Sequence, residues 1–236
     1  MSIRIQHLTK IYGSQKAVND ISFDVQPGEI MGFLGPNGAG KSTTMKITTG
    51  YLSATDGKAE VCGFDVARQS MEVRRNIGYL PEHNPLYTDM YIKEFLRFVG
   101  TLYSLKGEKL TKRVLEMIEI CGLEAEQSKK IGQLSKGYRQ RVGLAQALIH
   151  DPAVLILDEA TTGLDPNQIV EIRNLIKAVG KEKTVLFSSH IMQEVEAICD
   201  RAVIINRGQI VADQTLSELQ SQGNSLEEVF HRLTMQ

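Results

Sequence analysis

The chain has 236 residues, and its 27 Lys and Arg against 28 Asp and Glu give a net charge of -1 with no basic run. This balance argues against a nucleic-acid partner. The three cysteines, Cys62, Cys121 and Cys199, form no C-x-x-C pair, which argues against a disulfide framework or a zinc site and fits a reducing cytosol. No apolar run approaches the roughly 18 residues of a membrane span, so we expect a soluble chain, and its length suggests one domain over 1–236, with or without an inserted lobe.

The amino-terminal part of the sequence predicts antiparallel β structure. Its apolar residues alternate in two short runs, and the turn sequence Gln26-Pro-Gly-Glu29 ends the second run. The alternating residues are Ile3, Ile5 and Leu8, and then Ile21, Phe23 and Val25.

The next stretch has the spacing of a phosphate-binding loop, G-x-x-x-x-G-K-[ST]. An apolar strand, Ile30 to Leu34, precedes it, and a helix that opens at Lys41 comes after it. Small residues let backbone N–H groups surround phosphate oxygens, Lys41 brings a cation to the β- and γ-phosphates, and Ser42 offers a hydroxyl to Mg²⁺. The predicted nucleotide-binding residues are Gly35, Pro36, Asn37, Gly38, Ala39, Gly40, Lys41, Ser42 and Thr43.

The middle of the chain changes character after a short strand. Residues Ile77 to Leu80 are followed by Pro81, which disfavours helix. From Tyr91 to about Ile149 the apolar residues recur at helical spacing, with breaks at Gly107 and Gly122. We therefore expect an inserted helical subdomain at about residues 83 to 150.

The last third alternates strands with helices. Apolar runs at 153–157, 184–187 and 202–205 predict strands buried on both faces, and helices are expected at 168–179 and 191–198. This order predicts an α/β fold with a mainly parallel sheet. Two short helices, at 217–220 and 225–233, are expected to close the chain.

Two neighbouring carboxylates end the strand at 153–157. A nucleotide hydrolase needs one carboxylate near Mg²⁺ and another to deprotonate the attacking water, and Asp158 and Glu159 are candidates for these roles. Side chains of adjacent strand residues point to opposite faces, so both serve one site only if the strand ends there. The alternative is a pair of solvated charges at a strand end.

A second helix start has the features of an anion site. Ser135 is placed to cap a helix that runs to about His150, and Gly137 leaves backbone N–H groups accessible. We call each helix start that is suited to bind phosphate a clamp; the first is the phosphate loop, and the second is formed by Ser135 and Gly137. One nucleotide does not easily contact two clamps of one subunit, so we expect Ser135 and Gly137 to face a nucleotide held by another subunit. Taken alone, the pattern also fits a simple capped helix.

Together these motifs resemble the ATP-binding cassette family over nearly the whole chain. The family signature L-S-G-G-Q stands here as Leu134-Ser-Lys-Gly-Tyr138, which resembles variants in the exporter group. By this resemblance Tyr12 stacks on adenine, Glu82 replaces a glutamine that contacts the metal and the membrane partner, and His190 reaches the γ-phosphate. Gly163-Leu-Asp165-Pro matches the loop that passes signals across the dimer.

The resemblance also implies a function. It predicts a phosphate-loop ATPase that uses ATP and Mg²⁺, pairs with a second ATP-binding subunit, and drives a separate transmembrane permease from the inner face of the membrane. Residues 77–87 and 226–230 look most similar to gliding-motility-associated ATPases of the exporter group. The alternative is a cassette ATPase that does not transport and serves metal-cluster assembly or a cell-wall enzyme. A nucleotide-gated scaffold without turnover is disfavoured by Glu159 and His190.

Several single residues have plainer interpretations. Tyr12 fits an ordinary aromatic at a strand end, and His190 fits an ordinary residue at a helix start. Glu82 comes directly after Pro81 and is either a metal ligand with Ser42 and Asp158, which is our hypothesis, or a solvated loop charge.

Overall fold

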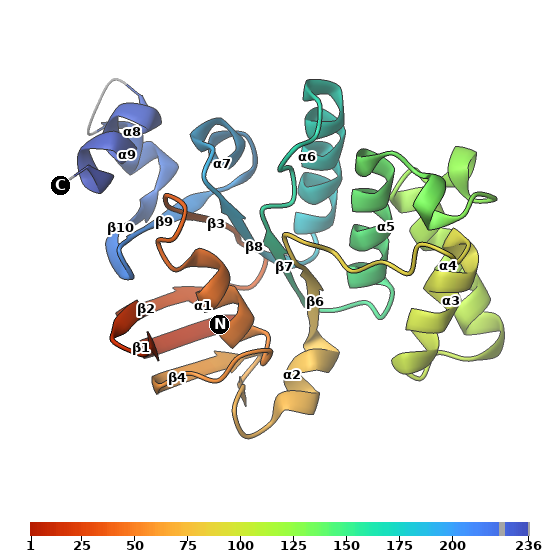
Figure 1. Cartoon of the computed structure of the whole chain (residues 1–236), viewed down its shortest axis with the longest axis horizontal. Helices are drawn as coiled ribbons and strands as arrows, with labels where there is room; N and C mark the ends of the chain where they lie inside the picture. Colours follow the sequence, from red (N-terminus) through yellow and green to blue (C-terminus); the bar gives the residue numbers. More distant parts are fainter. Residues whose placement is uncertain (222–224, 236) are drawn as a thin grey trace.

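A six-stranded sheet forms the centre of the molecule in the computed structural model, which describes residues 1–221 and 225–235 (Figure 1). Its strand order is β10-β9-β3-β8-β7-β6, and every neighbouring pair is parallel except β9 with β10. The strands are β3 (Ile30–Leu34), β6 (Ile77–Leu80), β7 (Val154–Asp158), β8 (Thr184–Ser189), β9 (Arg201–Asn206) and β10 (Gln209–Thr215).

A smaller antiparallel sheet contains the amino-terminal strands. Its order is β2-β1-β4-β5, and register shifts along β1 mark irregular pairing with both neighbours. Figure 1 shows this sheet beside α1, below the central sheet. Its strands are β1 (Ile3–Tyr12), β2 (Gln15–Val25), β4 (Asp56–Val61) and β5 (Phe64–Asp65).

The helices fall into separate groups around the central sheet. Helices α6 and α7 lie on the opposite side from α1, and α3, α4 and α5 gather beyond β6 (Figure 1). Short 3₁₀ turns at Glu124–Glu126 and Ile131–Gln133 join α4 to α5. The helices are α1 (Lys41–Thr48), α2 (Ser70–Asn76), α3 (Ile92–Leu102), α4 (Gly107–Ile120), α5 (Lys136–Leu148), α6 (Pro166–Gly180), α7 (Met192–Ile198), α8 (Leu216–Ser221) and α9 (Leu226–Thr234).

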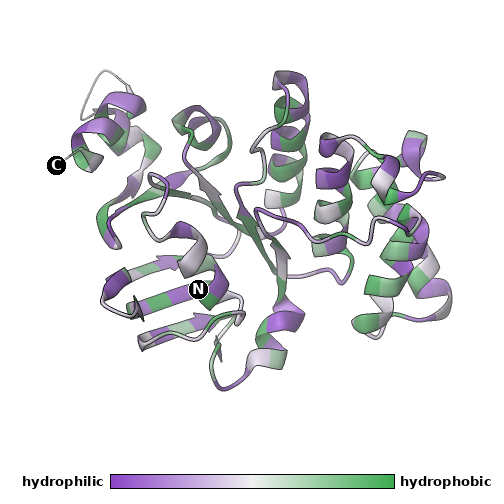
Figure 2. Ribbon diagram, viewed as in Figure 1, coloured by the Kyte–Doolittle hydropathy of each residue, from purple (hydrophilic) through white to green (hydrophobic). Residues whose placement is uncertain are grey.

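The central sheet separates two hydrophobic cores. Alternate residues of β7 point to opposite faces, so Leu155 and Leu157 join the core under the helices while Val154 and Ile156 join the core with the smaller sheet. Figure 2 shows these central strands as hydrophobic along their length. Burial on both faces explains the unbroken apolar runs of the sequence, and it holds the ends of β3, β7 and β8 in fixed positions.

The predicted fold class is confirmed: a phosphate-loop core with a mainly parallel sheet, an antiparallel amino-terminal part and inserted helices. The limits of a subdomain at 83 to 150 stay a prediction. The sequence pattern predicts neither α2 nor β10; the residues of β10 alternate between half-buried and exposed. In the part of the chain that is described, no helix is both long enough and apolar enough to cross a membrane.

Candidate nucleotide site

The phosphate loop lies between β3 and α1 and depends on its glycines. Gly40 caps α1 in a left-handed conformation with φ 110°, and Gly38 has φ 79°. A Cβ at Gly35 would lie 2.4 Å from the Ile205 carbonyl oxygen, and one at Gly40 would lie 2.5 Å from that of Ala17. Both glycines are therefore required by space, and Gly40 also by its backbone conformation.

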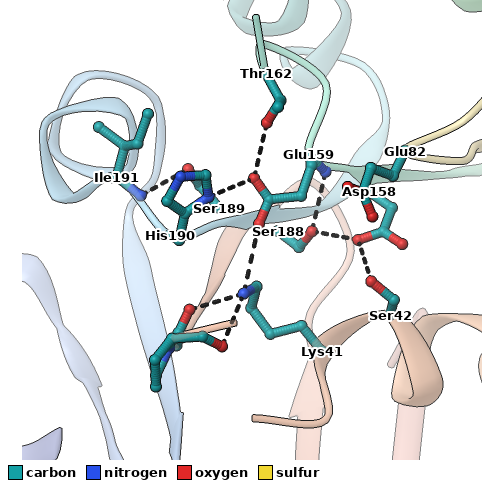
Figure 3. Close-up of polar contacts among 12 residues, drawn as sticks. Lys41, Ser42, Glu82, Asp158, Glu159, Thr162, Ser188, Ser189, His190 and Ile191 are labelled. Atoms are coloured by element: carbon teal, nitrogen blue, oxygen red, sulfur yellow. Dashed lines mark hydrogen bonds and ion pairs between the residues drawn. The ribbon is translucent and has the colours of Figure 1, made fainter. Parts of the chain in front are cut away.

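Lys41 is the buried cation of the site. Its Nζ donates to the carbonyl oxygens of Gly35 at 2.7 Å and Pro36 at 3.3 Å, and it lies 3.4 Å from Oε1 of Glu159 (Figure 3). The Lys41 side chain is only 6% exposed. An ammonium group with little water around it interacts strongly with any anion that enters.

Asp158 ends β7 beside the first turn of α1. Its Oδ1 accepts hydrogen bonds from Ser42 Oγ at 3.2 Å and from Ser188 Oγ at 2.7 Å. Burial raises the pKa of Asp158 and outweighs these two hydrogen bonds, and the charges of Glu159 and Glu82 raise it further. A divalent cation would relieve this cost because it stabilises the ionised carboxylate.

Glu159 is held from several sides at the point where β7 ends. Its backbone is left-handed, with φ 54°, and its N–H donates to Ser188 Oγ at 3.1 Å. The Oε2 atom accepts from Thr162 Oγ1 at 3.0 Å and lies 2.8 Å from Nδ1 of His190. Figure 3 shows the carboxylate pointing between Lys41 and His190. The turn away from the strand lets Asp158 and Glu159 serve one site, as the sequence prediction required.

His190 comes directly after β8 in a loop that has its own support. Since an ionised carboxylate only accepts, His190 Nδ1 donates to Glu159, and Nε2 is left for another group. The preceding Ser189 donates to the buried Glu194 at 2.7 Å and accepts from the N–H of Ile191 at 3.0 Å. Together these bonds fix the backbone on both sides of His190.

One cavity of about 490 Å³ brings most of the predicted residues together. Glu82 lines it, which places this side chain beside the phosphate loop. Tyr12 does not line it: the residue is 49% exposed, and Lys10 Nζ lies 5.2 Å from the centroid of its ring. Adenine stacking by Tyr12 therefore stays a prediction. The lining residues are Ala17, Asn37, Gly38, Gly40, Lys41, Ser42, Thr43, Glu82, Glu159, Thr162 and His190.

The oxygens beside this cavity fit Mg²⁺. Ser42 and Asp158 place a hydroxyl and a carboxylate oxygen 3.2 Å apart, and Glu82 adds a second carboxylate to the same cavity. Mg²⁺ is usually held by one or two protein oxygens together with phosphates and water. Among the described residues no cluster of three or more His, Cys, Asp or Glu side chains could hold a metal, so the phosphates would have to complete the shell.

The second predicted clamp lies at the start of α5 and not in this cavity. Ser135 Oγ accepts from the N–H of Tyr138 at 3.3 Å, which matches the expected cap. Gly137 is buried, and a Cβ there would meet the side-chain amide of Gln168 at 2.6 Å. The two residues therefore share a helix start that is separate from the phosphate loop of the same chain.

Comparisons with known proteins decide the family. A family model described as ABC transporter matches residues 18–162. The chain belongs to the ABC transporter family. The ABC transporter ATP-binding protein NatA of Bacillus subtilis (strain 168) is 40% identical over 206 residues, which cover 86% of this chain and 84% of the relative. The bacitracin transport ATP-binding protein BcrA of Bacillus licheniformis is 39% identical over 213 residues, covering 89% and 69%.

Solved structures agree with this assignment. The structure of an ATP-binding subunit of an ABC transporter has a TM-score of 0.89 and 31% identity, and the match covers 99% of both chains. A bacterial ABC transporter cassette solved as a dimer has a TM-score of 0.83 and 25% identity, covering 91% of this chain and 98% of that one. This ABC protein is thus an ATP-binding subunit with an ATPase domain, as the sequence resemblance predicted.

Sequence reasoning missed several residues that contact the site of this ABC subunit. Ser188 bridges Asp158 and the backbone of Glu159, Thr162 donates to the Glu159 carboxylate, and Ser189 with Glu194 supports the His190 loop. The only available signal was position, because Ser188 and Ser189 end an apolar strand next to His190. Serine and threonine are too common at strand ends for that signal to be decisive.

Proposed function

We propose that the chain is the ATP-hydrolysing subunit of an export-type ABC transporter and drives a separate transmembrane permease. The observation that carries the catalytic part is the convergence of Lys41, Ser42, Glu159 and His190 on one cavity, with Asp158 hydrogen-bonded to Ser42. These residues come from three strand ends that lie side by side in the parallel sheet. Such an edge is where parallel α/β sheets bind ligands.

Each side chain has a separate part in the proposed reaction. The loop N–H groups and Lys41 bind the β- and γ-phosphates. Glu159 accepts the proton of the attacking water, and His190 would act as an imidazolium that donates from Nδ1 to Glu159 and from Nε2 to the γ-phosphate. When bound, Mg²⁺ would neutralise phosphate charge, with Ser42, Asp158 and Glu82 as its protein contacts.

The second clamp is assigned to the nucleotide of a partner subunit. Ser135 and Gly137 are not among the residues that line the cavity of Lys41, which supports their assignment to the nucleotide of another subunit. A similar cassette has been solved as a dimer. ATP held between two copies would favour the closed dimer, because a ligand shifts an equilibrium only by binding one state better.

Export is the finer part of the proposal. BcrA is named for bacitracin transport, and YbhF of Escherichia coli, 38% identical over 221 residues, is named a probable multidrug ABC transporter ATP-binding protein. The described residues include no membrane-crossing helix, so a permease from another chain would provide the path and hold this subunit at the inner face of the membrane. The gliding-motility link is a narrower prediction, and a non-transport ATPase is the alternative.

Two measurements test this proposal. Glu159→Gln should lower ATP turnover by about 10² to 10⁴, because an amide cannot accept the proton, and should give a dimer in size-exclusion chromatography only when ATP is present. Glu119→Gln, on the exposed side of α4, is the matched control and should behave like wild type. Tagged Glu159→Gln protein should also retain a multi-span membrane protein from detergent extracts, and a cassette that copurifies only with soluble proteins would contradict the transport role.

A further inference from the structure

A single hydrogen bond joins the helix that carries the second clamp to the loop that carries Glu159. Nε2 of Gln140 in α5 donates to the carbonyl oxygen of Ala160 at 2.8 Å. Ala160 is fully buried and comes directly after Glu159 in the chain. Nothing in the proposed reaction assigns a role to Gln140.

The carbonyl of Ala160 belongs to a backbone segment with an unfavourable conformation. Glu159 is left-handed, which costs a non-glycine residue about 1 kcal/mol or more and persists only where its surroundings hold it. Ser188 Oγ holds the N–H side of Glu159, and Gln140 holds the carbonyl of the next residue. The direction of the Glu159 carboxylate toward Lys41 and His190 depends on this segment.

Helix α5 also contacts the rest of that loop. A Cβ added to Gly163 would lie 2.1 Å from Nζ of Lys136, so the first side chain of α5 lies against the loop. At the next position Gly137 lies against Gln168, whose N–H and side chain pair with Asp165 at the start of α6. The α5 start and the 159–165 loop are thus packed together within one subunit.

The distance along α5 between the two functions is short. Gln140 is three residues beyond Gly137 and five beyond Ser135, and an α-helix has about 3.6 residues per turn, so the hydrogen bond lies less than one and a half turns from both residues. Arg141 ties the same part of α5 to the Cys121 carbonyl at 3.0 Å and to Glu171 of α6. Because Gln140 and Gly137 are so close on the same helix, a shift of the α5 start moves Gln140 with it.

We propose that Gln140 is a positioning residue that sets the backbone of Glu159 according to the position of α5. Engagement of Ser135 and Gly137 with the partner's ATP would then place the subunit's own base through Gln140 and Ala160. The positioning role concerns the ATPase reaction itself, whereas the link to the partner's ATP rests on the proposed dimer. Gln140 acts through Glu159 and does not touch the nucleotide cavity.

The first test replaces the donor. Gln140→Met keeps the length of the side chain and removes the N–H, and it should lower kcat about tenfold with KM for ATP within about twofold, because small displacements of a catalytic group mainly affect the reaction step. Arg139→Met, one residue earlier and exposed on the same helix, should leave both values unchanged. Should Gln140→Met fold poorly, Gln140→Glu keeps polarity and length and should lose kcat in the same way.

The second test separates positioning from general damage to the helix. The rate of ATP hydrolysis is measured in a single turnover, with and without Gln140→Met. The substitution should lower this rate about tenfold in the wild-type protein but less than about twofold in Glu159→Gln. A residue that acts through the Glu159 base has little to position once that base is gone. Equal slowing in both backgrounds, or an unchanged kcat in the first test, overturns the proposal.

The third test measures the ATP-dependent dimer of the same proteins by size-exclusion chromatography. Glu159→Gln with Gln140→Met should still form the ATP-dependent dimer, since the clamp is intact. Loss of this dimer only on adding Gln140→Met overturns the inference, because Gln140 then supports assembly and not the base. Absence of the dimer in Glu159→Gln alone contradicts the proposed function, while the kinetic coupling between Gln140 and Glu159 still decides the positioning role.

Discussion

The starts of α1 and α5 are both suited to anions, but they are built differently. Helix α1 is capped by Gly40 with no side-chain hydrogen bond, and buried Lys41 opens it beside Asp158 and Glu159. Helix α5 is capped by the exposed Ser135, which already accepts from the N–H of Tyr138. The α1 start thus lines a pocket within one subunit, whereas the α5 start lies outside that pocket, and we propose that it binds the nucleotide of a partner.

Removing the cation at the α1 start should have the largest effect. Lys41→Ala should weaken ATP binding roughly a thousandfold, because each hydrogen bond to a charged group contributes about 1.5–3 kcal/mol and Lys41 is expected to contact two phosphates. Isothermal titration with ATP measures the loss. Lys46→Ala, exposed in the last turn of the same helix, is the control and should bind normally. Wild-type affinity in Lys41→Ala would show that α1 is not the nucleotide site.

A charge at the α5 start should damage turnover and leave binding to the monomer intact. Gly137→Asp should lower kcat about a hundredfold, since like charges facing each other across an interface cost several kcal/mol. Any side chain at this position must displace the Gln168 amide, so Gly137→Ala controls for that displacement and should lose much less. If the isolated Gly137→Asp subunit binds ATP poorly, the two helix starts serve one nucleotide and the comparison fails.

The far end of α5 provides a pH test of how the helix is anchored. His150 lies just beyond α5, stacks on Tyr103 at 3.7 Å between centroids, and donates from Nε2 to the Ile77 carbonyl at 3.0 Å. The pKa of His150 is lowered to about 4, chiefly by burial; the Ile77 hydrogen bond opposes this shift, the charges of Arg113 and Lys183 add to it, and Asp151 opposes it.

The sign of the pH effect is set by proton binding. Between pH 6.5 and 4 the unfolded chain binds a proton at His150 that the folded protein does not, so stability falls as pH falls through this window. The loss should be about 2 kcal/mol for this partly exposed ring. Urea unfolding at several pH values measures it, and His150→Gln should flatten the slope while the exposed control His7→Gln should not. If the free energy of unfolding of His150→Gln depends on pH as steeply as that of wild type, His150 is not the group responsible.

The smallest expected effect concerns Glu82, which lines the α1 cavity and also a second cavity of about 520 Å³ against α5. Its side chain is 43% exposed. Glu82→Gln should raise the Mg²⁺ concentration for half-maximal ATPase activity about fivefold, because a unit charge near the metal in a wet site contributes about 1 kcal/mol. ATP affinity at saturating Mg²⁺ should not change. An unaltered Mg²⁺ dependence would show that Glu82 does not contact the metal. Glu82 would then be either a contact for the permease or an ordinary surface residue.

Features that depend on local chemistry can be predicted from the amino-acid sequence of this protein. The spacing of Gly35, Gly40 and Lys41 predicts a phosphate loop because the backbone there needs glycine and the anion needs a cation. Apolar runs predicted the buried strands β7, β8 and β9, since a strand covered on both faces needs no polar residues. The N-cap at Ser135 could be predicted for the same local reason.

Contacts between residues far apart in the chain depend on how the strands and helices pack. Ser188 reaches Asp158 because β8 lies between β3 and β7, and Gln140 reaches Ala160 because α5 packs against the loop after β7. Tyr12 fits the sequence pattern for the nucleotide but lies outside the cavity. Sequence patterns record the period of each element and its turns, whereas strand order and helix packing depend on long-range burial that no single segment specifies.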